Sequence, residues 1–418
     1  HFYPLGSCTM KYNPRACNKL AMLPEFLGRH PLAPESHSQG FLACMYELQE
    51  MLKDVTGMAG VSLTPMAGAQ GEFAGVAMIR AYHRARNDHA RNEILVPNAA
   101  HGTNPATATM LGMTVREIPT DAQGDVDVAA LEAAVGPQTA GIMLTNPSTL
   151  GVFERDIARI AKIVHKAGGL LYYDGANLNA ILGKVRPGDM GFDVIHMNLH
   201  KTFSTPHGGG GPGAGPVVLS EALAAFAPKP WVVAGTNGFD MLEHDEGSSA
   251  ANFGRMCAFH GQMGMFIRAL TYMLSHGSDG LRQVAEDAVL NANYIKASLQ
   301  DLMSVPFPEG PCMHEALFDD AWLEGTGVTT LDFAKAMIDV GFHPMTMYFP
   351  LVVHGAMLIE PTETESKDEL DGFIAVLRAL AEAAKAGDVA RFKGAPYLAP
   401  AKRLDETRAA RAPRLSYI

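Results

Sequence analysis

Six short apolar stretches, separated by segments with helical spacing, constrain the fold of this chain more than any other feature of its sequence. Between two of them, Ile157, Ile160 and Val164 repeat at helical spacing, and two glycines at 168–169 provide a stop for that helix. Strands that alternate with helices favour a mostly parallel sheet covered by helices, with active groups at the carboxyl ends of the strands. We predict strands at residues 93–96, 115–118, 141–145, 170–174, 193–198 and 215–219.

The pattern changes along the chain and predicts three parts. Residues 1–39 are rich in Pro, Gly and Asn with little periodicity, which predicts an extended N-terminal arm. Residues 40–300 are expected to form a large α/β domain, since prolines and a glycine at 306–311 interrupt its pattern. Residues 301–418 are expected to form a small α+β C-terminal domain, with a last clear helix that begins near Ser366, where Ser366 and Glu369 have capping-box spacing.

Composition excludes several classes of function. The net charge of −11 and the absence of a basic run argue against nucleic acid as a partner. No apolar run approaches the roughly 20 residues that span a bilayer, so no membrane segment is predicted. The five cysteines are scattered without C-x-x-C spacing, which predicts reduced thiols, a cytoplasmic protein and no metal site. The first residue is His, so we expect part of the natural N-terminus to be missing.

Lys201 is the first candidate for chemistry. It lies in the sequence NLHKTF at residues 198–203, directly after a predicted strand and before a glycine run. Most lysines are solvated surface residues, whereas covalent catalysis by lysine needs a neutral amine in a desolvated or positively charged setting. The glycine run from 207 to 213 lacks the ending of a nucleotide P-loop and the spacing of a dinucleotide loop. We therefore interpret it as a flexible segment of an active site.

Three further positions give Lys201 a context. Asp174 ends an apolar strand and is either a helix cap or a carboxylate that keeps a pyridine nitrogen protonated. Ala176, two residues later, is small enough to lie flat under a ring. His101 follows another strand and is either structural or placed to stack on a planar cofactor.

A glycine-rich turn completes the set. Gly68-Ala69-Gln70-Gly71-Glu72 leads into a helix, and backbone N–H groups at a helix start suit a phosphate dianion, although many loops look similar. A phosphate turn, a stacking histidine, a ring-nitrogen aspartate and a Schiff-base lysine occur here in chain order. This order resembles that of fold-type I enzymes, which depend on pyridoxal phosphate (PLP).

Longer stretches make the resemblance more specific. Residues 2–14, 68–72, 101–106, 147–154, 198–203 and 206–216 are similar to the glycine decarboxylase family, the P-protein of the glycine cleavage system. They cover roughly residues 1–216. The chain resembles the lysine-bearing second subunit into which bacteria often divide this enzyme. One departure is Ser204, where many members carry Cys.

The resemblance implies a role for each candidate residue. Lys201 is expected to hold PLP as a Schiff base, Asp174 to pair with the ring nitrogen, and His101 to stack on the ring. His200, beside the lysine, is a candidate for moving protons. The remaining cofactor contacts implied are Ala69 and Gln70 at the phosphate, Thr145 at the ring hydroxyl and Ala176 beneath the ring.

The implied activity is decarboxylation of glycine, with transfer of the aminomethyl group to the lipoyl arm of a partner H-protein and release of CO₂. The implied assembly is an α2β2 heterotetramer with the first P-protein subunit. Two alternatives stay open at this point. One is another fold-type I enzyme, an aminotransferase or an amino-acid decarboxylase without a lipoyl partner. The other is a non-catalytic scaffold subunit.

Overall fold

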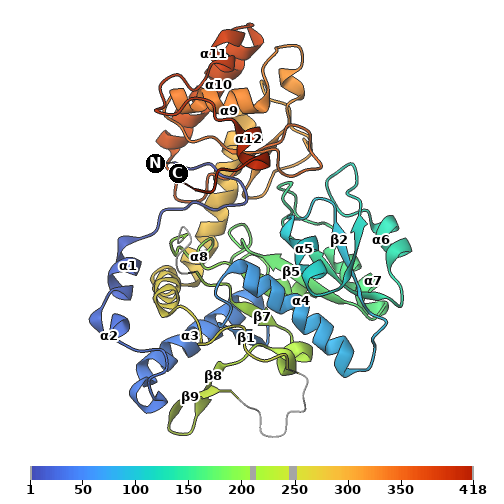
Figure 1. The fold of residues 1–418 in the computed structure, drawn as a ribbon, viewed down its shortest axis with the longest axis vertical. Coiled ribbons are helices and arrows are strands. Elements are labelled where there is room, and N and C mark those ends of the chain that lie inside the picture. Colours follow the sequence, from blue (N-terminus) through green and yellow to red (C-terminus); the bar gives the residue numbers. More distant parts are fainter. Residues whose placement is uncertain (1, 208–212, 244–251, 417–418) are drawn as a thin grey trace.

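A computed structural model describes residues 2–207, 213–243 and 252–416 of the chain, which form a large domain around a central sheet and a smaller domain beside it (Figure 1). The central sheet has seven strands in the order β1-β7-β6-β5-β4-β2-β3. Strands β2 to β6 are parallel, while β7 and β1 are antiparallel to their neighbours. Most of the predicted glycine-rich segment, residues 208–212, lies outside the described residues.

All six predicted strands are present, and every end lies within two residues of its predicted position. The strand β1 was not predicted, because three residues at a sheet edge carry too little periodicity. The strands are β1 (Gly60–Ser62), β2 (Glu93–Pro97), β3 (Thr114–Ile118), β4 (Thr139–Leu144), β5 (Leu170–Gly175), β6 (Val194–Met197) and β7 (Val217–Leu219).

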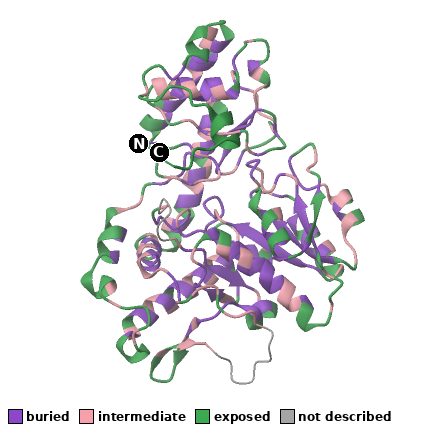
Figure 2. Cartoon of the chain, viewed as in Figure 1, coloured by how far each residue is buried: buried purple, intermediate pink, exposed green. Residues whose placement is uncertain are grey.

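Helices pack on both faces of the sheet, and the inner parallel strands β2, β4, β5 and β6 are buried on both sides, whereas most of β3 at the sheet edge is exposed (Figure 2). Successive side chains of a strand point to opposite faces, and on β5 Tyr172 and Tyr173 accordingly belong to two different hydrophobic clusters. One cluster contains side chains of α4 (Gly68–Ala85) and α5 (Thr103–Met110). The other contains side chains of α3 (Gln39–Thr56), α7 (Ile157–Lys166) and the first half of α8 (Met263–Leu299).

Helix α8 connects the large and small domains. Gly277 within it has φ of 61°, a left-handed conformation that interrupts the helix. Side chains on both sides of this interruption, from Met265 to Ala285, join the core of the large domain, and Ala292, Ile295 and Leu299 join the core of the small domain. The predicted domain boundary near residue 300 therefore falls at the end of a helix whose last turns already pack with the small domain.

The small domain has a three-stranded antiparallel sheet, β10 (Ala316–Phe318), β12 (Met357–Ile359) and β11 (Thr346–Met347), with helices packed on it. The helix predicted near Ser366 is α10, and Ser366 accepts a hydrogen bond from the Glu369 N–H as its N-cap. The other helices are α9 (Thr330–Asp339), α11 (Val389–Lys393) and α12 (Glu406–Arg411), and α10 spans Lys367–Lys385.

The N-terminal segment is not extended throughout. It includes α1 (Arg15–Ala21), α2 (Pro24–Leu27) and one turn of 3₁₀ helix, Glu35–His37. Cys17 and Ala21 of α1 are buried, and α1 packs on α8, which explains helix formation in a segment with weak periodicity of its own. The other described elements are α6 (Val128–Ala134), the hairpin of β8 (Trp231–Gly235) and β9 (Gly238–Leu242), and short 3₁₀ helices at Pro187–Met190, Glu221–Phe226 and Ala321–Leu323. None of the helices described here has the length and apolar character that crossing a bilayer requires.

Candidate active site

A cavity of about 160 Å³ lies beside the carboxyl ends of β4, β5 and β6. An engineered cavity of about 150 Å³ holds benzene, so this one has the size for a six-membered aromatic ring. Its wall has a strand side, formed by the large domain, and an arm side, formed by the N-terminal segment and the small domain. Strand-side residues are Gly68, Ala69, Glu72, His101, Thr103, Thr145, Pro147, Ser148, Thr149, Asp174, Ala176, Asn177, His196, Asn198 and Lys201; arm-side residues are Ser7, His314 and Glu315.

Asp174 is held at the end of β5 by a neighbouring strand. The β5–β6 register places it next to His196, whose Nε2 lies 3.5 Å from Asp174 Oδ1. Tyr172 hydrogen-bonds to the other ring nitrogen, Nδ1, of His196. Burial lowers the pKa of His196 and raises that of Tyr172, so the phenol donates to Nδ1 and the imidazole hydrogen faces Asp174.

A second group of side chains reaches Asp174 from the helices. With its amide nitrogen turned toward the acids, Asn104 donates to Asp174 Oδ2 at 3.0 Å and to Glu72 Oε1 at 3.1 Å. Burial and then the charge of Asp174 raise the pKa of Glu72 to about 7. Asp174 is thus surrounded by polar partners that fix its direction.

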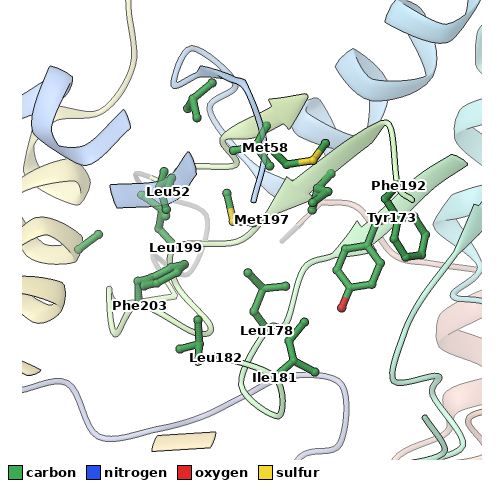
Figure 3. Close-up of a cluster of buried hydrophobic side chains, with 14 of the residues drawn as sticks. Leu52, Met58, Tyr173, Leu178, Ile181, Leu182, Phe192, Met197, Leu199 and Phe203 are labelled. Atoms are coloured by element: carbon green, nitrogen blue, oxygen red, sulfur yellow. The ribbon is translucent and has the colours of Figure 1, made fainter. Parts of the chain in front are cut away.

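Lys201 projects into the cavity because its neighbours anchor the loop after β6. Leu199 and Phe203 are fully buried in the cluster of hydrophobic side chains below the loop (Figure 3). Thr202 Oγ1 accepts a hydrogen bond of 2.8 Å from the Leu178 N–H. The amine of Lys201 lies across the cavity, where Nζ donates to the carbonyl oxygen of Ser7 at 2.8 Å.

Helix α4 begins at the cavity, as the glycine-rich turn predicted. The first N–H groups of a helix lack partners within it and suit a phosphate. A Cβ at Gly68 would lie 2.1 Å from Asn198 Oδ1, so only glycine allows the helix start to come this close. Ala69 lines the cavity, whereas Gln70 is outside its wall and accepts a hydrogen bond from the Met66 N–H at 2.8 Å.

The wall fits a ring with polar substituents. Thr145 Oγ1 and Asn198 Oδ1 are buried and have no hydrogen-bond partner among the described residues. A buried polar atom without a partner is costly. A hydroxyl group bound here could donate to Asn198 Oδ1, and Thr145 Oγ1 could donate to a hydroxyl or phosphate oxygen. PLP carries both groups, so the donor set and the size of the cavity match this cofactor.

The two predicted histidines have different surroundings. His101 lines the cavity, with Nδ1 2.9 Å from Thr103 Oγ1 and its ring tilted against Phe349 at 5.5 Å between centroids. His200 does not line the cavity and packs edge-to-face with His207. Burial, followed by electrostatic interactions with His207 and Lys201, lowers the pKa of His200 to about 4. His200 is therefore neutral at pH 7, and its proton-transfer role stays a prediction, as does the phosphate contact of Gln70.

Several wall residues were not predicted. Glu72 lay within a quoted motif, and its place one helical turn after Gly68 was a signal that could have found it. His196 lies two residues before the end of the predicted strand at 193–198, so its position near the carboxyl edge of the sheet was also a usable signal. No local pattern marked the arm-side residues His314 and Glu315 as part of this site.

Fold and cavity together define a fold-type I PLP-dependent enzyme. Residues 71–251 match the aminotransferase class-V family, and residues 284–394 match the C-terminal domain of glycine dehydrogenase. The chain is 68% identical over 99% of its length, and 79% of the relative's, to glycine dehydrogenase (decarboxylating) subunit 2 of Caulobacter vibrioides. It is 63% identical to the protein of the same name from Thiobacillus denitrificans, covering 100% of this chain and 86% of that one. The chain belongs to this subunit 2 family.

Solved structures agree on the fold. A glycine decarboxylase P-protein in inhibitor-bound form has a TM-score of 0.75 at 21% identity, covering 91% of this chain and 85% of that one. A glutamate decarboxylase of Lactobacillus brevis has a TM-score of 0.70 at 15% identity, covering 91% and 88%. The whole-chain similarity to subunit 2 proteins supports the glycine decarboxylase prediction over the aminotransferase and scaffold alternatives.

Proposed function

We propose that this chain is the PLP-bearing subunit of a glycine decarboxylase, and that it releases CO₂ from glycine and passes the aminomethyl group to the lipoyl arm of an H-protein. The observation that carries the proposal is the meeting of Lys201 and Asp174 in the wall of one ring-sized cavity. A lysine that holds an aldehyde cofactor and a carboxylate that pairs with its ring nitrogen must face the same ring.

The residues of the strand side have distinct tasks in this reaction. When bound, PLP supplies an electron-accepting ring for the electron pair released as CO₂ leaves. Asp174 holds the proton at the ring nitrogen, and His196 and Asn104 keep its carboxylate in place. Lys201 is the residue that would hold the cofactor covalently, while Ala69 and Gly68 at the start of α4 would receive the phosphate.

Selection of glycine follows from the size of the cavity. Glycine has no side chain to recognise, so the site must exclude larger amino acids by lack of space. Exclusion of one methylene by size contributes roughly 1–3 kcal/mol. The arm side closes the cavity opposite the sheet and limits the room beside the ring.

The partners proposed are a first P-protein subunit, in an α2β2 heterotetramer, and a lipoylated H-protein. The name subunit 2 of the relatives supports a partner subunit. We also propose that the protein works in the cytoplasm, which is supported by its five cysteines, all of which are free thiols.

The test is reconstitution with the first subunit and lipoylated H-protein, followed by measurement of glycine-dependent exchange of labelled CO₂. We expect exchange only when all three proteins and PLP are present. Amino-group transfer to a 2-oxo acid, without need of H-protein, would contradict the proposal.

The cofactor attachment is tested separately by borohydride reduction and peptide mapping. The label is expected on Lys201, and Lys201→Ala should remove the visible absorption band. Lys184→Ala is the matched control, because Lys184 pairs with Glu286 at the surface, and it should keep the band. A label on any other lysine overturns the assignment.

A further inference from the structure

Two buried glutamates face each other on the arm side of the cavity. Glu315 and Glu360 directly flank the paired ends of β10 and β12, where Ala316 is in register with Ile359, so continuation of that antiparallel register brings the two acids side by side. The exposed fractions of these residues are 2% and 0%. One ring nitrogen of His314 and one carboxylate oxygen each of Glu315 and Glu360 lie within 4.8 Å of one another.

Both carboxyl groups receive hydrogen bonds from the N-terminal arm. The Ser7 N–H donates to Glu315 Oε1. Thr9 donates to Glu360 twice, from its N–H to Oε2 at 3.0 Å and from Oγ1 to Oε1 at 2.6 Å. Asn177 of the large domain also donates to Glu360 Oε1, at 2.8 Å. The pair therefore joins the arm, the small domain and the large domain.

The arm needs these contacts to keep its shape. Ser7 and Thr9 have φ of 61° and 48°, a left-handed conformation that residues with a side chain rarely adopt. A strained backbone persists only when its surroundings determine it. The hydrogen bonds to Glu315 and Glu360 act on these same two residues, and they supply that constraint.

Two carboxylates this close and this buried cannot both be ionised. Burial and then the charge of Glu360 raise the pKa of Glu315 well above its ordinary value. The other titratable groups that face the pair are Lys201, Lys11, Cys8, His207 and His314, and burial lowers the pKa of both histidines, so they add no charge at pH 7. Glu360 accepts three hydrogen bonds from Thr9 and Asn177, whereas Glu315 accepts one, from the Ser7 N–H, and hydrogen-bonds to Glu360, so the shared proton is placed on Glu315.

The arm in turn touches the reactive lysine. Ser7, whose N–H is held by Glu315, offers its carbonyl oxygen to Lys201 Nζ at 2.8 Å. We propose that Glu315 and Glu360 are positioning residues that share one proton and thereby fix the arm against the cavity, so that Ser7 sets the location of the Lys201 amine. The proposal rests on the proposed function only for the role of Lys201.

The experiment uses the full chain without cofactor and follows amide hydrogen exchange of the arm peptide that contains Ser7 and Thr9, over pH 6 to 10. Protection of these amides should fall by at least about tenfold as pH rises and Glu315 loses its proton, because the hydrogen bond between the two acids is then replaced by repulsion between two carboxylates. Glu315→Gln keeps a donor toward Glu360 and an acceptor for Ser7, so it should keep the protection and remove its pH dependence. Glu315→Ala should lose the protection at every pH.

The matched control is Glu154→Gln, another buried acid with a raised pKa that accepts only from backbone N–H groups far from the arm. It should leave the pH dependence as in the wild type.

The proposal is overturned if Glu315→Ala stays protected, or if Glu315→Gln still loses protection at alkaline pH. It is also overturned if a chelator alone removes the protection, because a cation rather than a proton would then join the acids. These readouts need no cofactor, so they can fail while the assignment of Lys201 holds, and the borohydride mapping can fail while they succeed.

Discussion

The strand side and the arm side of the cavity are built in different ways. On the strand side, Asp174, His196 and Asn198 come from neighbouring parallel strands, and the register of the sheet places them. On the arm side, Ser7 lies more than 300 residues from Glu315 along the chain. Its position depends on contacts between distant segments, among them the bridge between Leu5 and Ile359.

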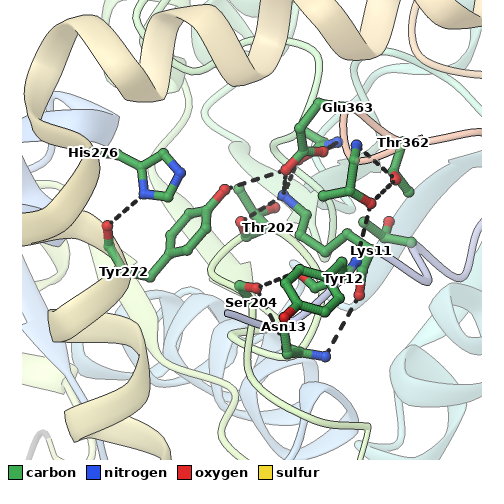
Figure 4. A network of polar contacts seen from close by, with 12 residues as sticks. Lys11, Tyr12, Asn13, Thr202, Ser204, Tyr272, His276, Thr362 and Glu363 are labelled. Atoms are coloured by element: carbon green, nitrogen blue, oxygen red, sulfur yellow. Dashed lines mark hydrogen bonds and ion pairs between the residues drawn. The ribbon is translucent and has the colours of Figure 1, made fainter. Parts of the chain in front are cut away.

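The difference shows where the stability of the site resides. The strand side shares the hydrophobic core of the large domain, so it keeps its structure as long as the central sheet stays folded. The arm side is anchored by polar contacts, including the buried Lys11, whose amine reaches Glu363, Asn179 and the carbonyl of Thr202 (Figure 4). The strength of such polar contacts depends on the charges of their partners. The stability of the arm side should therefore respond to substitutions and to pH far more than that of the strand side.

The largest effect is expected for Lys11→Met, which removes the cation from the arm side. Lys11 Nζ lies 2.7 Å from Glu363 Oε1, and both side chains are buried. Loss of one partner of a buried pair leaves an uncompensated charge and costs about 3–5 kcal/mol. Denaturant unfolding measures this change. Lys53→Met, which breaks an exposed pair with Glu50, is the control and should cost under about 1 kcal/mol; equal losses for the two variants would contradict a special role of the arm.

Asp174→Asn tests the strand side through catalysis instead of stability. The amide keeps the shape but cannot hold a proton at the ring nitrogen through an opposite charge. We expect kcat for glycine-dependent exchange to fall roughly 10²–10³-fold, as for loss of one electrostatic contact in a preorganised site. Asp189→Asn, at an exposed pair with Arg186, should retain activity within about twofold. Unchanged activity in Asp174→Asn would remove Asp174 from the mechanism.

Glu72→Gln should change the pH dependence of stability on the strand side. Burial and Asp174 raise the pKa of Glu72 to about 7 from an ordinary value of 4.5. A raised pKa means that the folded state binds the proton more tightly, so this stabilisation is complete below pH 4.5 and is lost as pH rises through 7. In the cofactor-free chain, the Tm of the variant relative to wild type should therefore rise between pH 5 and pH 8. A constant difference across that range would show that Glu72 is ionised throughout.

The smallest effect is expected for Gln70→Ala. Gln70 was predicted to hold the phosphate, but its side chain contacts Met66 outside the cavity wall. Binding of PLP, followed by absorbance titration, should weaken by no more than about tenfold, which corresponds to one hydrogen bond of roughly 1 kcal/mol. A loss of more than a hundredfold would restore the direct contact with the phosphate.

Sequence reasoning predicted the strand side because its signals are local. An apolar strand that ends in Asp174, and a lysine after the next strand, indicate the carboxyl edge of a parallel sheet without knowledge of anything distant. Glu315 and Glu360 gave no such signal, since their meeting depends on the pairing of β10 with β12 and on the path of the arm. The α1 helix was missed for the same reason, as its stability comes from packing on α8.

Gly277 marks a kink in α8, the helix that runs from the large domain to the small one. Leu281, Val284 and Ala285, after this kink, still belong to the core of the large domain, and Ala292, Ile295 and Leu299 continue into the core of the small domain. A Cβ added at position 277 would have no atom within 4 Å, so a substitution there would cost stability only through the strain of the positive φ. The cores of the two domains that flank the cavity are therefore joined by a single helix whose kink is formed by a residue without a side chain.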